Sequence, residues 1–385
     1  MWTLRDLPLV DEFTKKPKKR IRFPTKLNIC EDCLNVQLSV VPDVKGYYKN
    51  YIYPNTVNSE FQRHYQEYAD YIKGFLKGRF FRRVLDFGKD DDYLLRCICS
   101  HRKQAIAIRP SLNRSNKNNL LYPKKYITSY DEKDLIRLSG KIKKKCDIII
   151  VNNFLANIDD LKGVLKFFKT VASRKCLIFI ETSNFNQMLQ NRVFDMIYHE
   201  HLSYFHKYPL VKFFAKYGFE CIEIKEVNTK GGSNRYVFKN ITSHNYQRSQ
   251  SRARNKGKVS IKYIFRKIGE IKKTLKTQES KIHRLLMKNK ITKCAVYGAS
   301  ATTTAFLENM LSRETFTNQI DDNPLKERLY SPFSNLKVLT PSSQNLEKFD
   351  CIVIGAWRFA DKIQNKLQSF RGLKINPWPK ATIIK

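Results

Sequence analysis

Residues 146–181 read CDIIIVNNFLANIDDLKGVLKFFKTVASRKCLIFIE and hold a strand, a helix and a second strand in succession. The runs at 146–153 and 176–181 are apolar and rich in β-branched residues, which is typical of parallel strands buried on both faces. Between them, residues 161–171 have the apolar spacing of a helix. This unit predicts an α/β fold with a doubly wound sheet.

The same alternation extends in both directions along the chain. Apolar strands are predicted at 84–88 and 105–108, and a helix is predicted at 60–78. From Ile291 the alternation resumes with KCAVYGASATTTAFLENM and later FDCIVIGAW, which predicts a second, smaller Rossmann-like unit. The apolar face of the first helix comprises Phe61, Tyr65, Tyr68, Ile72 and Phe75.

Four segments follow from this pattern. Residues 1–60, interrupted by prolines, form a small loop-rich module, and residues 61–240 form the first α/β domain. Residues 241–290 form a basic linker with a long helix from Ile261 onward, and residues 291–385 form the C-terminal Rossmann-like domain. The stripe of the linker helix comprises Ile264, Ile268, Ile271, Leu275, Ile282 and Leu285.

The chain of 385 residues carries a net charge of +37, which favours anionic partners such as nucleic acid or nucleotides. Between Lys239 and Lys290, 16 Lys/Arg residues stand against two acidic residues. Such a block is typical of an interaction surface, here for nucleic acid or a ribonucleoprotein, although a solvated face explains it as well.

Cysteine usage and hydropathy bear on the location of the protein. Nine cysteines are scattered along the chain, which favours the cytoplasm or another reducing compartment. No run of 18 uncharged apolar residues occurs, and the first residues do not have the pattern of a signal peptide. We therefore expect no membrane span and no secretion.

The densest group of reactive side chains is Tyr198-His199-Glu200-His201, within FDMIYHEHLSYF. Imidazole and phenol groups suit the removal of a proton next to a carbonyl. A zinc protease helix requires H-E-x-x-H, whereas the two histidines here are two residues apart. The segment predicts proton-transfer chemistry, and a structural hydrogen-bond network is the alternative.

Two strand ends have the features of a cofactor site. Asp86 and Gly88 end the strand at 84–88, as in the S-adenosylmethionine site of class I methyltransferases, where the backbone approaches the cofactor closely. Asn152 and Asn153 end the strand at 146–153, at the edge where cofactors bind in open sheets. An ordinary strand-to-helix turn or a helix cap also explains these residues.

Three further motifs suggest binding. The turn with Gly231, Gly232, Ser233 and Arg235 offers N–H groups, a hydroxyl and a guanidinium to an anion or a sugar, or is a simple hairpin turn. Gly298 and Ser300 open a helix whose N–H groups suit a phosphate, or Ser300 is only a cap. Cys30 and Cys33 supply half of a structural zinc site, with His64 or another cysteine as a further ligand.

In this order, the motifs resemble the nucleotide-sugar C-methyltransferases, which add a methyl group to C3 of a dTDP-linked keto sugar. Members have an N-terminal zinc module, a central S-adenosylmethionine domain and a C-terminal Rossmann-like domain. The resemblance covers nearly the whole chain, and IYHEH is its most specific motif. The matching stretches are PLVDEF, ICEDCLNVQLS, YYKNYIYPNTVNSEFQRH, VNNFLANIDDL, FDMIYHEHLSYF, GGSNR, YGASA, DDNPLKERLYSP and NPWP.

The resemblance implies a mechanism. A base removes the proton from C3 beside the C4 ketone, and the resulting enolate attacks the sulfonium methyl of S-adenosylmethionine. His201 is expected to be the base, with Tyr198 as the alternative, while Glu200 holds a sugar hydroxyl. The C-terminal domain, including Asn323, and the linker are expected to bind the nucleotide diphosphate of the substrate.

The chain departs from the family pattern at the cofactor loop and the zinc module. Gly88-Lys89-Asp90-Asp91-Asp92 replaces the family's acidic glycine turn, so Asp91 is the expected contact and Asp92 would repel the cofactor carboxylate. Ile108 replaces the ribose-binding acid, and Thr302 and Thr303 follow Ala301 where the family has a lysine. The family's first CxxC pair has no counterpart in the sequence, so the zinc module is expected to be truncated.

Two functions therefore compete. The first is a methyltransferase acting on a nucleotide-linked keto-deoxysugar. The second is a catalytically inactive methyltransferase fold that serves as a basic structural or RNA-binding component of a ribonucleoprotein or virus particle. A methyltransferase acting on nucleic acid is a third interpretation, for which the sequence shows no recognition motif.

Overall fold

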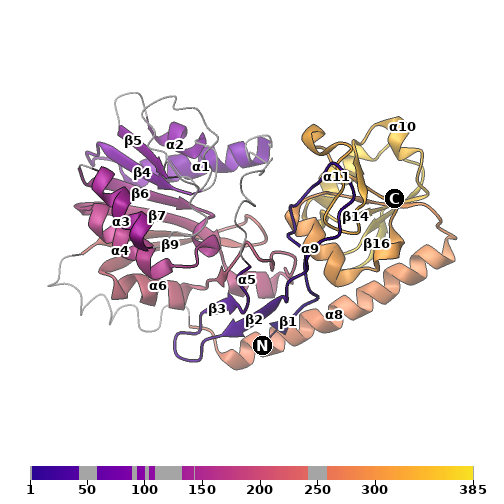
Figure 1. Cartoon of the computed structure of the whole chain (residues 1–385), viewed down its shortest axis with the longest axis horizontal. Helices are drawn as coiled ribbons and strands as arrows, with labels where there is room; N and C mark the ends of the chain where they lie inside the picture. The colour runs from indigo at the N-terminus through magenta and orange to yellow at the C-terminus, as the bar shows by residue number, and fades with distance from the viewer. Residues whose placement is uncertain are drawn as a thin grey trace.

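The computed structural model describes residues 2–42, 59–88, 93–99, 104–108, 132–142, 144–241 and 258–384. Figure 1 shows two α/β units side by side, with the N-terminal segment between them and the long helix α8 (Ile261–Lys288) below. We call residues 2–42 the N-terminal module, residues 59–241 the central unit and residues 291–384 the C-terminal unit.

The central unit is built on a six-stranded sheet with the order β5-β4-β6-β7-β10-β9. Its first four strands run parallel, whereas β10 is antiparallel to both β7 and β9. The winding reverses between β4 and β6, and such a switch point is where open α/β sheets bind ligands. The strands are β4 (Arg83–Phe87), β5 (Gln104–Ile108), β6 (Cys146–Asn152), β7 (Ala172–Ser183), β9 (Phe219–Val227) and β10 (Ser233–Asn240).

Helices cover both faces of this sheet, which confirms the predicted doubly wound fold. Tyr68 and Ile72 of α1 pack with α2 on one face. Phe168 of α4 and Phe214 of α6 pack with α3 on the other face. The helices are α1 (Ser59–Phe75), α2 (Tyr93–Ile98), α3 (Glu132–Lys141), α4 (Leu161–Val171), α5 (Phe185–Gln190) and α6 (Lys207–Lys216), with the 3-10 turn η3 (Leu155–Asn157).

The N-terminal module contains an antiparallel sheet, so the prediction of an irregular module was incomplete. Its order is β1-β2-β3-β8, and β8 is contributed by the central unit. The strands are too short to show an alternating pattern, which is why the sequence alone did not reveal them. They are β1 (Trp2–Thr3), β2 (Lys26–Ile29), β3 (Val36–Leu38) and β8 (Ser203–Tyr204). Residues 43–58 of the module lie outside the described residues.

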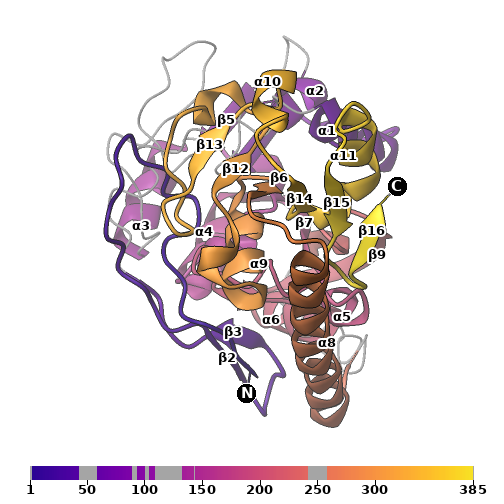
Figure 2. The ribbon, with the colours of Figure 1, turned by 90° about the vertical axis from the view of Figure 1, so that its right-hand side faces the viewer.

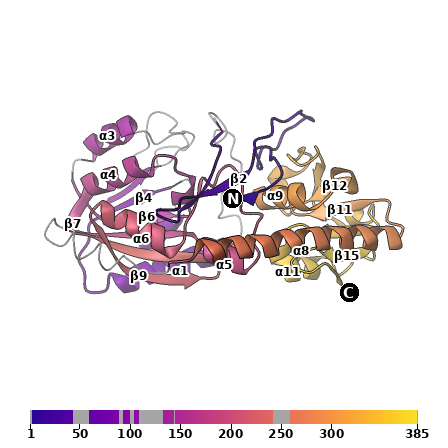
Figure 3. The same ribbon diagram turned by 90° about the horizontal axis from the view of Figure 1, so that it is seen from below.

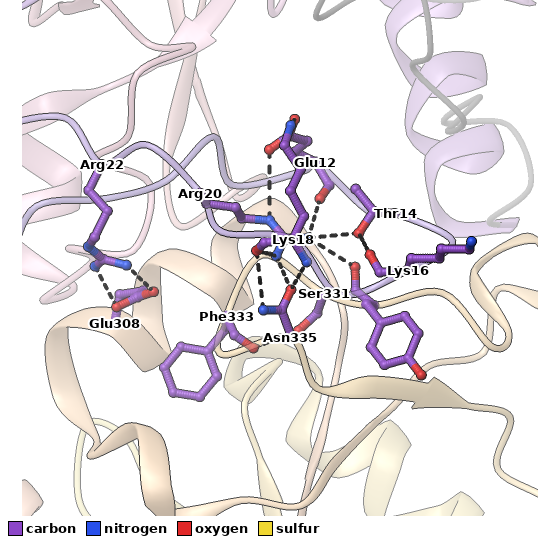
Figure 4. Close-up of polar contacts among 11 residues, drawn as sticks. Glu12, Thr14, Lys16, Lys18, Arg20, Arg22, Glu308, Ser331, Phe333 and Asn335 are labelled. Carbon is purple, nitrogen blue, oxygen red and sulfur yellow. Dashed lines mark hydrogen bonds and ion pairs between the residues drawn. The ribbon is translucent and has the colours of Figure 1, made fainter.

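Residues 4–25, between β1 and β2, lie along the C-terminal unit, and we call them the strap. Figure 4 shows its polar contacts: the Arg20 guanidinium donates to Asn335 Oδ1, and Arg22 binds both carboxylate oxygens of Glu308 at 2.9 and 2.7 Å. Thr14 exchanges both backbone hydrogen bonds with Tyr330. The basic cluster from Lys15 to Lys26 therefore contributes to contacts between units.

The C-terminal unit has a six-stranded sheet with the order β13-β12-β11-β14-β15-β16. Figure 2 shows this sheet from the side of the C-terminal unit, with β13 and β12 at one end and β15 and β16 at the other. All strands except the last run parallel, as predicted for a second Rossmann-like unit. The strands are β11 (Cys294–Tyr297), β12 (Asn318–Ile320), β13 (Lys337–Leu339), β14 (Cys351–Ile354), β15 (Leu373–Asn376) and β16 (Thr382–Ile384). The helices are α9 (Ala301–Met310), α10 (Ser343–Leu346) and α11 (Ala360–Lys366), with turns η5 (Arg313–Thr315), η6 (Pro324–Lys326) and η7 (Trp357–Phe359).

Helix α8 connects the two units along the outside of the molecule, as Figure 3 shows from below. Its N-terminal half contacts α5, and its apolar side also contacts α9. The predicted stripe is confirmed from Ile264 to Ile282, but Leu286, not Leu285, is the last fully buried residue. Leu285 is only partly buried beside the same core. Linker residues 242–257 lie outside the described residues.

No helix among the described residues is both long enough and apolar enough to cross a membrane. None of the nine cysteines forms a disulfide in the structure.

Candidate active site

The segment around Tyr198 lies where all three parts of the molecule meet. Tyr198 packs against Leu7 and Val10 of the strap and against Ala305 of α9 in the C-terminal unit. On the other side, Leu202 N–H donates to the carbonyl of Ala156, in the turn after β6. The segment is a series of turns and not a helix, and His201 N–H donates to the carbonyl of Tyr198 at 2.9 Å. It thus lies near the carboxyl end of the central parallel strands.

The two histidines of this segment point to different partners. His201 Nδ1 lies 2.9 Å from the carbonyl oxygen of Met196, and because a carbonyl can only accept, Nδ1 carries the proton. The lone pair of His201 is therefore on Nε2. His199 instead places Nε2 at 3.2 Å from the carbonyl of Pro24 in the strap, so its Nε2 is protonated. Burial lowers the pKa of His199, which favours a neutral ring.

The other two members of the motif are buried beside His201. The Tyr198 ring lies 4.3 Å from the His201 ring, centroid to centroid, and Tyr198 is 7% exposed. Glu200 is buried as well, whereas His201 is partly exposed.

The segment is tied to the C-terminal unit just before Tyr198. The Asp195 carboxylate accepts from Arg358 Nη1 at 2.7 Å and from the Trp357 indole N–H at 2.9 Å. Both partners belong to η7, which follows β14, and Asp195 is 1% exposed. Trp378 adds a bond from its indole N–H to the carbonyl of Arg192. These contacts fix the position of the segment between the two sheets.

The predicted cofactor residues gather at the switch point between β4 and β6. Asp86 and Asn152 are buried at the ends of these strands, and Asn153 follows with a positive φ of 49°. Among the described residues, the nearest atom to a Cβ added at Gly88 is Phe154 Cβ at 3.8 Å, an ordinary contact, so a methyl group fits here. Asp86 supplies a carboxylate and Asn152 and Asn153 supply amide groups at this point, which are groups that an adenosyl cofactor can use.

The end of the neighbouring strand β5 lacks the side chain expected for binding the ribose of the cofactor. Ile108 ends β5 buried at 1% exposure in the apolar core, and so offers no acceptor for a ribose hydroxyl. Asp91, predicted to contact the cofactor, and Asp92 lie outside the described residues.

A buried polar network next to this edge was not predicted. The Glu181 carboxylate accepts from His64 Nε2 at 2.7 Å, Arg235 Nε at 2.8 Å and Asn153 Nδ2 at 3.0 Å. Burial raises the pKa of Glu181, but the hydrogen bond and charge of His64, together with Arg235, outweigh it and lower the pKa to about 2. Glu181 ends an apolar strand run in the sequence, which is the one signal that could have suggested its role.

The structure therefore corrects one expectation about zinc. His64 is held by Glu181 in the central unit and is not a partner of Cys30 and Cys33, which lie in the turn between β2 and β3. Cys30 is exposed, and a hydrogen bond from the backbone of Cys33 lowers the pKa of the Cys30 thiol. Burial instead raises the pKa of the Cys33 thiol. Among the described residues no three His, Cys, Asp or Glu side chains gather to hold a metal. Two thiols alone do not fit a structural zinc site.

The predicted glycine-rich turn lies at the start of β10. Arg235 is 4% exposed, because its guanidinium binds Glu181 and lies 4.3 Å from the centre of the Tyr68 ring. Ser233 donates to the carbonyl of Thr229, and the glycines at 231 and 232 pack against Val193 and Gln187. Arg235 thus acts on the buried network, and the substrate contacts of this turn remain a prediction.

The predicted phosphate loop of the C-terminal unit is closely packed. Ser300 caps α9 by accepting from Thr303 N–H, and Asn323 caps η6 by accepting from Leu325 N–H. Lys326 reaches the same loop and donates to the carbonyl of Ala299 at 2.6 Å, beside Asp11 of the strap at 3.3 Å. A lysine from another segment therefore lies at the loop that leads to Thr302 and Thr303, and no sequence pattern indicated this.

Comparison with known proteins finds a family match for each of the two α/β units. Residues 61–224 match a methyltransferase domain family, and residues 228–376 match a family described as the C-methyltransferase C-terminal domain. The methyltransferase match agrees with the Rossmann-like fold of the central unit and its switch point. The second match is to a domain of C-methyltransferases, so the chain is similar over both units to S-adenosylmethionine-dependent C-methyltransferases.

Individual relatives are more distant. The C-methyltransferase NovU from Streptomyces niveus is 24% identical over 239 residues, which are 60% of this chain and 56% of NovU. The solved N-methyltransferase NodS from Bradyrhizobium japonicum has a TM-score of 0.35 at 9% identity, covering 48% of this chain and 99% of NodS. Magnesium protoporphyrin IX methyltransferase from Synechocystis has a TM-score of 0.36 at 12% identity, covering 51% and 95%.

Proposed function

We propose that the protein transfers a methyl group from S-adenosylmethionine to carbon C3 of a nucleotide-linked keto-deoxysugar. The observation that carries this proposal is the position of Tyr198–His201, which lies among the three units and beside the turn after β6. The match of residues 228–376 to the C-methyltransferase C-terminal domain supports methyl transfer to carbon. The resemblance of the sequence motifs to those of nucleotide-sugar C-methyltransferases is the reason for proposing the sugar.

His201 is proposed to remove the proton from C3. The hydrogen bond from Nδ1 to Met196 fixes the tautomer in which Nε2 carries the lone pair, and an imidazole needs this arrangement to act as a general base. The ring of Tyr198, at 4.3 Å, restricts the orientation of the imidazole, and its hydroxyl is the alternative base. Glu200 is proposed to orient the sugar by accepting from a hydroxyl group.

The switch point of the central sheet is proposed to bind the cofactor through Asp86, Gly88, Asn152 and Asn153. When bound, S-adenosylmethionine supplies the electrophilic methyl group that the deprotonated carbon accepts. The nucleotide diphosphate is assigned to the loops of the C-terminal unit, and the sugar to the turn before β10. The residues proposed for substrate binding are Gly231, Gly232, Ser233, Arg235, Gly298, Ser300 and Asn323.

The test combines the protein with a dTDP-linked 4-keto-deoxysugar and S-adenosylmethionine, and mass spectrometry measures the added methyl group. His201→Asn should reduce the rate by about 10² to 10⁴, the contribution of a general base. Exchange of the C3 hydrogen in heavy water, measured by NMR, reports the proton removal separately. His283→Asn, an exposed histidine on α8, is the matched control and should keep the full rate.

A binding measurement, combined with the methyl-transfer assay, addresses the alternative of an inactive scaffold protein. Calorimetry with S-adenosylmethionine at millimolar concentration should show binding if the switch point still accepts the cofactor. A folded protein that binds no cofactor and transfers no methyl group would contradict the enzymatic function. An unchanged rate in His201→Asn would remove only His201 from its role.

A further inference from the structure

The outer face of α8 carries a continuous row of positive side chains. The helix has 28 residues, which corresponds to a length of about 42 Å. Its apolar side is buried, and the opposite side holds basic residues at spacings that place them within about a third of the helix circumference. These exposed residues are Lys262, Arg266, Lys273, Lys276, Arg284 and Lys288.

The acidic residues of α8 do not neutralise this row. Glu270 pairs with Arg266 and Lys267, and Glu279 pairs with Arg5 of the strap. Within the described part of the chain, no acidic side chain forms an ion pair with Lys273, Lys276 or Arg284. The preceding residues 242–257 contain no Asp or Glu in the sequence. The charges of Lys273, Lys276 and Arg284 in the middle and at the C-terminal end of the row are therefore uncompensated.

An open groove continues the row at the C-terminal end of α8. It has a volume of about 720 Å³ and is lined by Lys290, Arg371 and Lys374, together with Asp350. The Asp350 carboxylate accepts from the backbone N–H groups of Thr292 and Lys293 and from the Thr292 hydroxyl. These hydrogen bonds keep Asp350 charged, but three cations stand against this one carboxylate, so these side chains give the groove a net positive charge.

We propose that the outer face of α8 and this groove bind the phosphate backbone of a nucleic acid. A regular row of Lys and Arg matches a chain of phosphates, and such contacts are independent of base sequence. The length of the row is close to one turn of a duplex, about 34–36 Å. The net charge of +37 adds long-range attraction for a polyanion.

A membrane surface fits these observations less well. Helices that lie in a membrane interface insert their apolar face between the lipids. The apolar stripe of α8, from Ile264 to Leu286, is instead buried against the rest of the protein. The exposed apolar side chains Phe265 and Met287 lie at opposite ends of the helix and form no continuous patch.

The experiment measures the fluorescence anisotropy of labelled DNA and RNA duplexes of arbitrary sequence with the full-length protein. Between about 50 and 200 mM salt, the logarithm of affinity should fall linearly with the logarithm of salt concentration. The variant K273Q/K276Q/R284Q should reduce the slope by about 3, since each lost phosphate contact removes about 1. Affinity at low salt should fall at least tenfold.

The control variant K73Q/K77Q/K162Q removes the same charge from exposed positions of the central unit. It should keep the slope and nearly all of the affinity. Equal losses in both variants would show that only net charge matters and would overturn the assigned surface. Absence of duplex binding at about 50 mM salt, or α8-dependent binding to phosphatidylserine vesicles without duplex binding, would overturn the nucleic-acid partner. Neither result depends on methyl transfer.

Discussion

The two Rossmann-like units differ most at their switch points. In the central unit, a Cβ added to Gly88 would find its nearest neighbour at 3.8 Å, which is an ordinary contact. In the C-terminal unit, a Cβ on Gly298 would lie 2.8 Å from Thr303 Oγ1 and 2.9 Å from Ala356 Cβ. Among the described residues, Gly88 thus has room for a methyl group and Gly298 has none, and we call the two switch points open and filled.

This difference assigns separate tasks to two similar sheets. The open switch point is where we propose that the cofactor binds, and the polar network of Glu181 lies at its edge. The loop after β14, at the filled switch point, instead holds the Tyr198 segment through Trp357 and Arg358. The corresponding edge of the C-terminal sheet thus positions the candidate site of the central unit.

The largest effect is expected from Glu181→Gln, which tests the network at the open edge. Removing this charge leaves the buried Arg235 without its carboxylate, and breaking a buried ion pair in this way costs about 3–5 kcal/mol. Chemical denaturation at neutral pH should show the loss of stability. A variant as stable as the wild type would mean that the network does not stabilise the fold.

Acid titration of the same variant gives a second measurement. The pKa of Glu181 is lowered to about 2, so its contribution is present above the ordinary value of 4.5 and is lost as the pH falls from 4.5 toward 2. The wild type should therefore lose about 3 kcal/mol more than Glu181→Gln over this range. Parallel curves would contradict a charged Glu181.

The next largest effect is a difference in stability between alanine variants of Gly298 and Gly88. Gly298→Ala places a methyl group inside contact distance of Ala356 and forces alanine to a φ of 114°, so we expect a loss of about 2–4 kcal/mol. Gly88→Ala meets no such contact and should change stability by less than about 1 kcal/mol. Thermal unfolding of the two variants measures this difference.

The two glycine variants should differ in the opposite direction in their affinity for the cofactor, with the larger loss in Gly88→Ala. The methyl group of Gly88→Ala enters the crevice proposed for S-adenosylmethionine, so calorimetry should show affinity reduced by about tenfold or more. Gly298→Ala should keep its affinity at a temperature at which it is folded. Unaltered affinity in Gly88→Ala would move the cofactor away from this crevice.

Much of the fold could be predicted because the buried strands are continuous apolar runs. The pattern at 146–181 corresponds to β6, α4 and β7, and the helix at 161–171 has the predicted bounds. The N-terminal sheet could not be predicted, since β1 and β8 have two residues each and pair only through distant parts of the chain. Leu285 and Leu286 follow Ile282 at spacings of three and four, so the apolar pattern alone did not decide which of the two is buried.

The candidate site was predictable only where its residues are adjacent in sequence. Tyr198–His201 stands out as a motif, and Asp86 and Asn152 end apolar strands. The partners of Glu181, by contrast, are 117 and 54 positions away, at His64 and Arg235. The Glu181–Arg235 pair depends on the register of β7 and β10, and the Glu181–His64 pair depends on how α1 packs on the sheet. No local sequence pattern encodes either.

The smallest effect is expected from Asp195→Asn, which tests how the filled switch point holds the site. Asparagine keeps an oxygen for the Trp357 indole but loses the charge that attracts Arg358 at 2.7 Å. A charge-assisted hydrogen bond exceeds a neutral one by about 1–2 kcal/mol, so stability should fall by about that amount.

The kinetic consequence distinguishes positioning from packing. If Asp195 only stabilises the fold, kcat and KM for the folded enzyme should not change. If it places His201 relative to the open crevice, kcat should fall while the affinity for S-adenosylmethionine stays the same, because small misplacements of a reacting group slow a reaction strongly. Arg358→Gln removes the same ion pair from the C-terminal side, and it should reproduce the effect of Asp195→Asn. The double variant should then add little, since the two changes break one interaction.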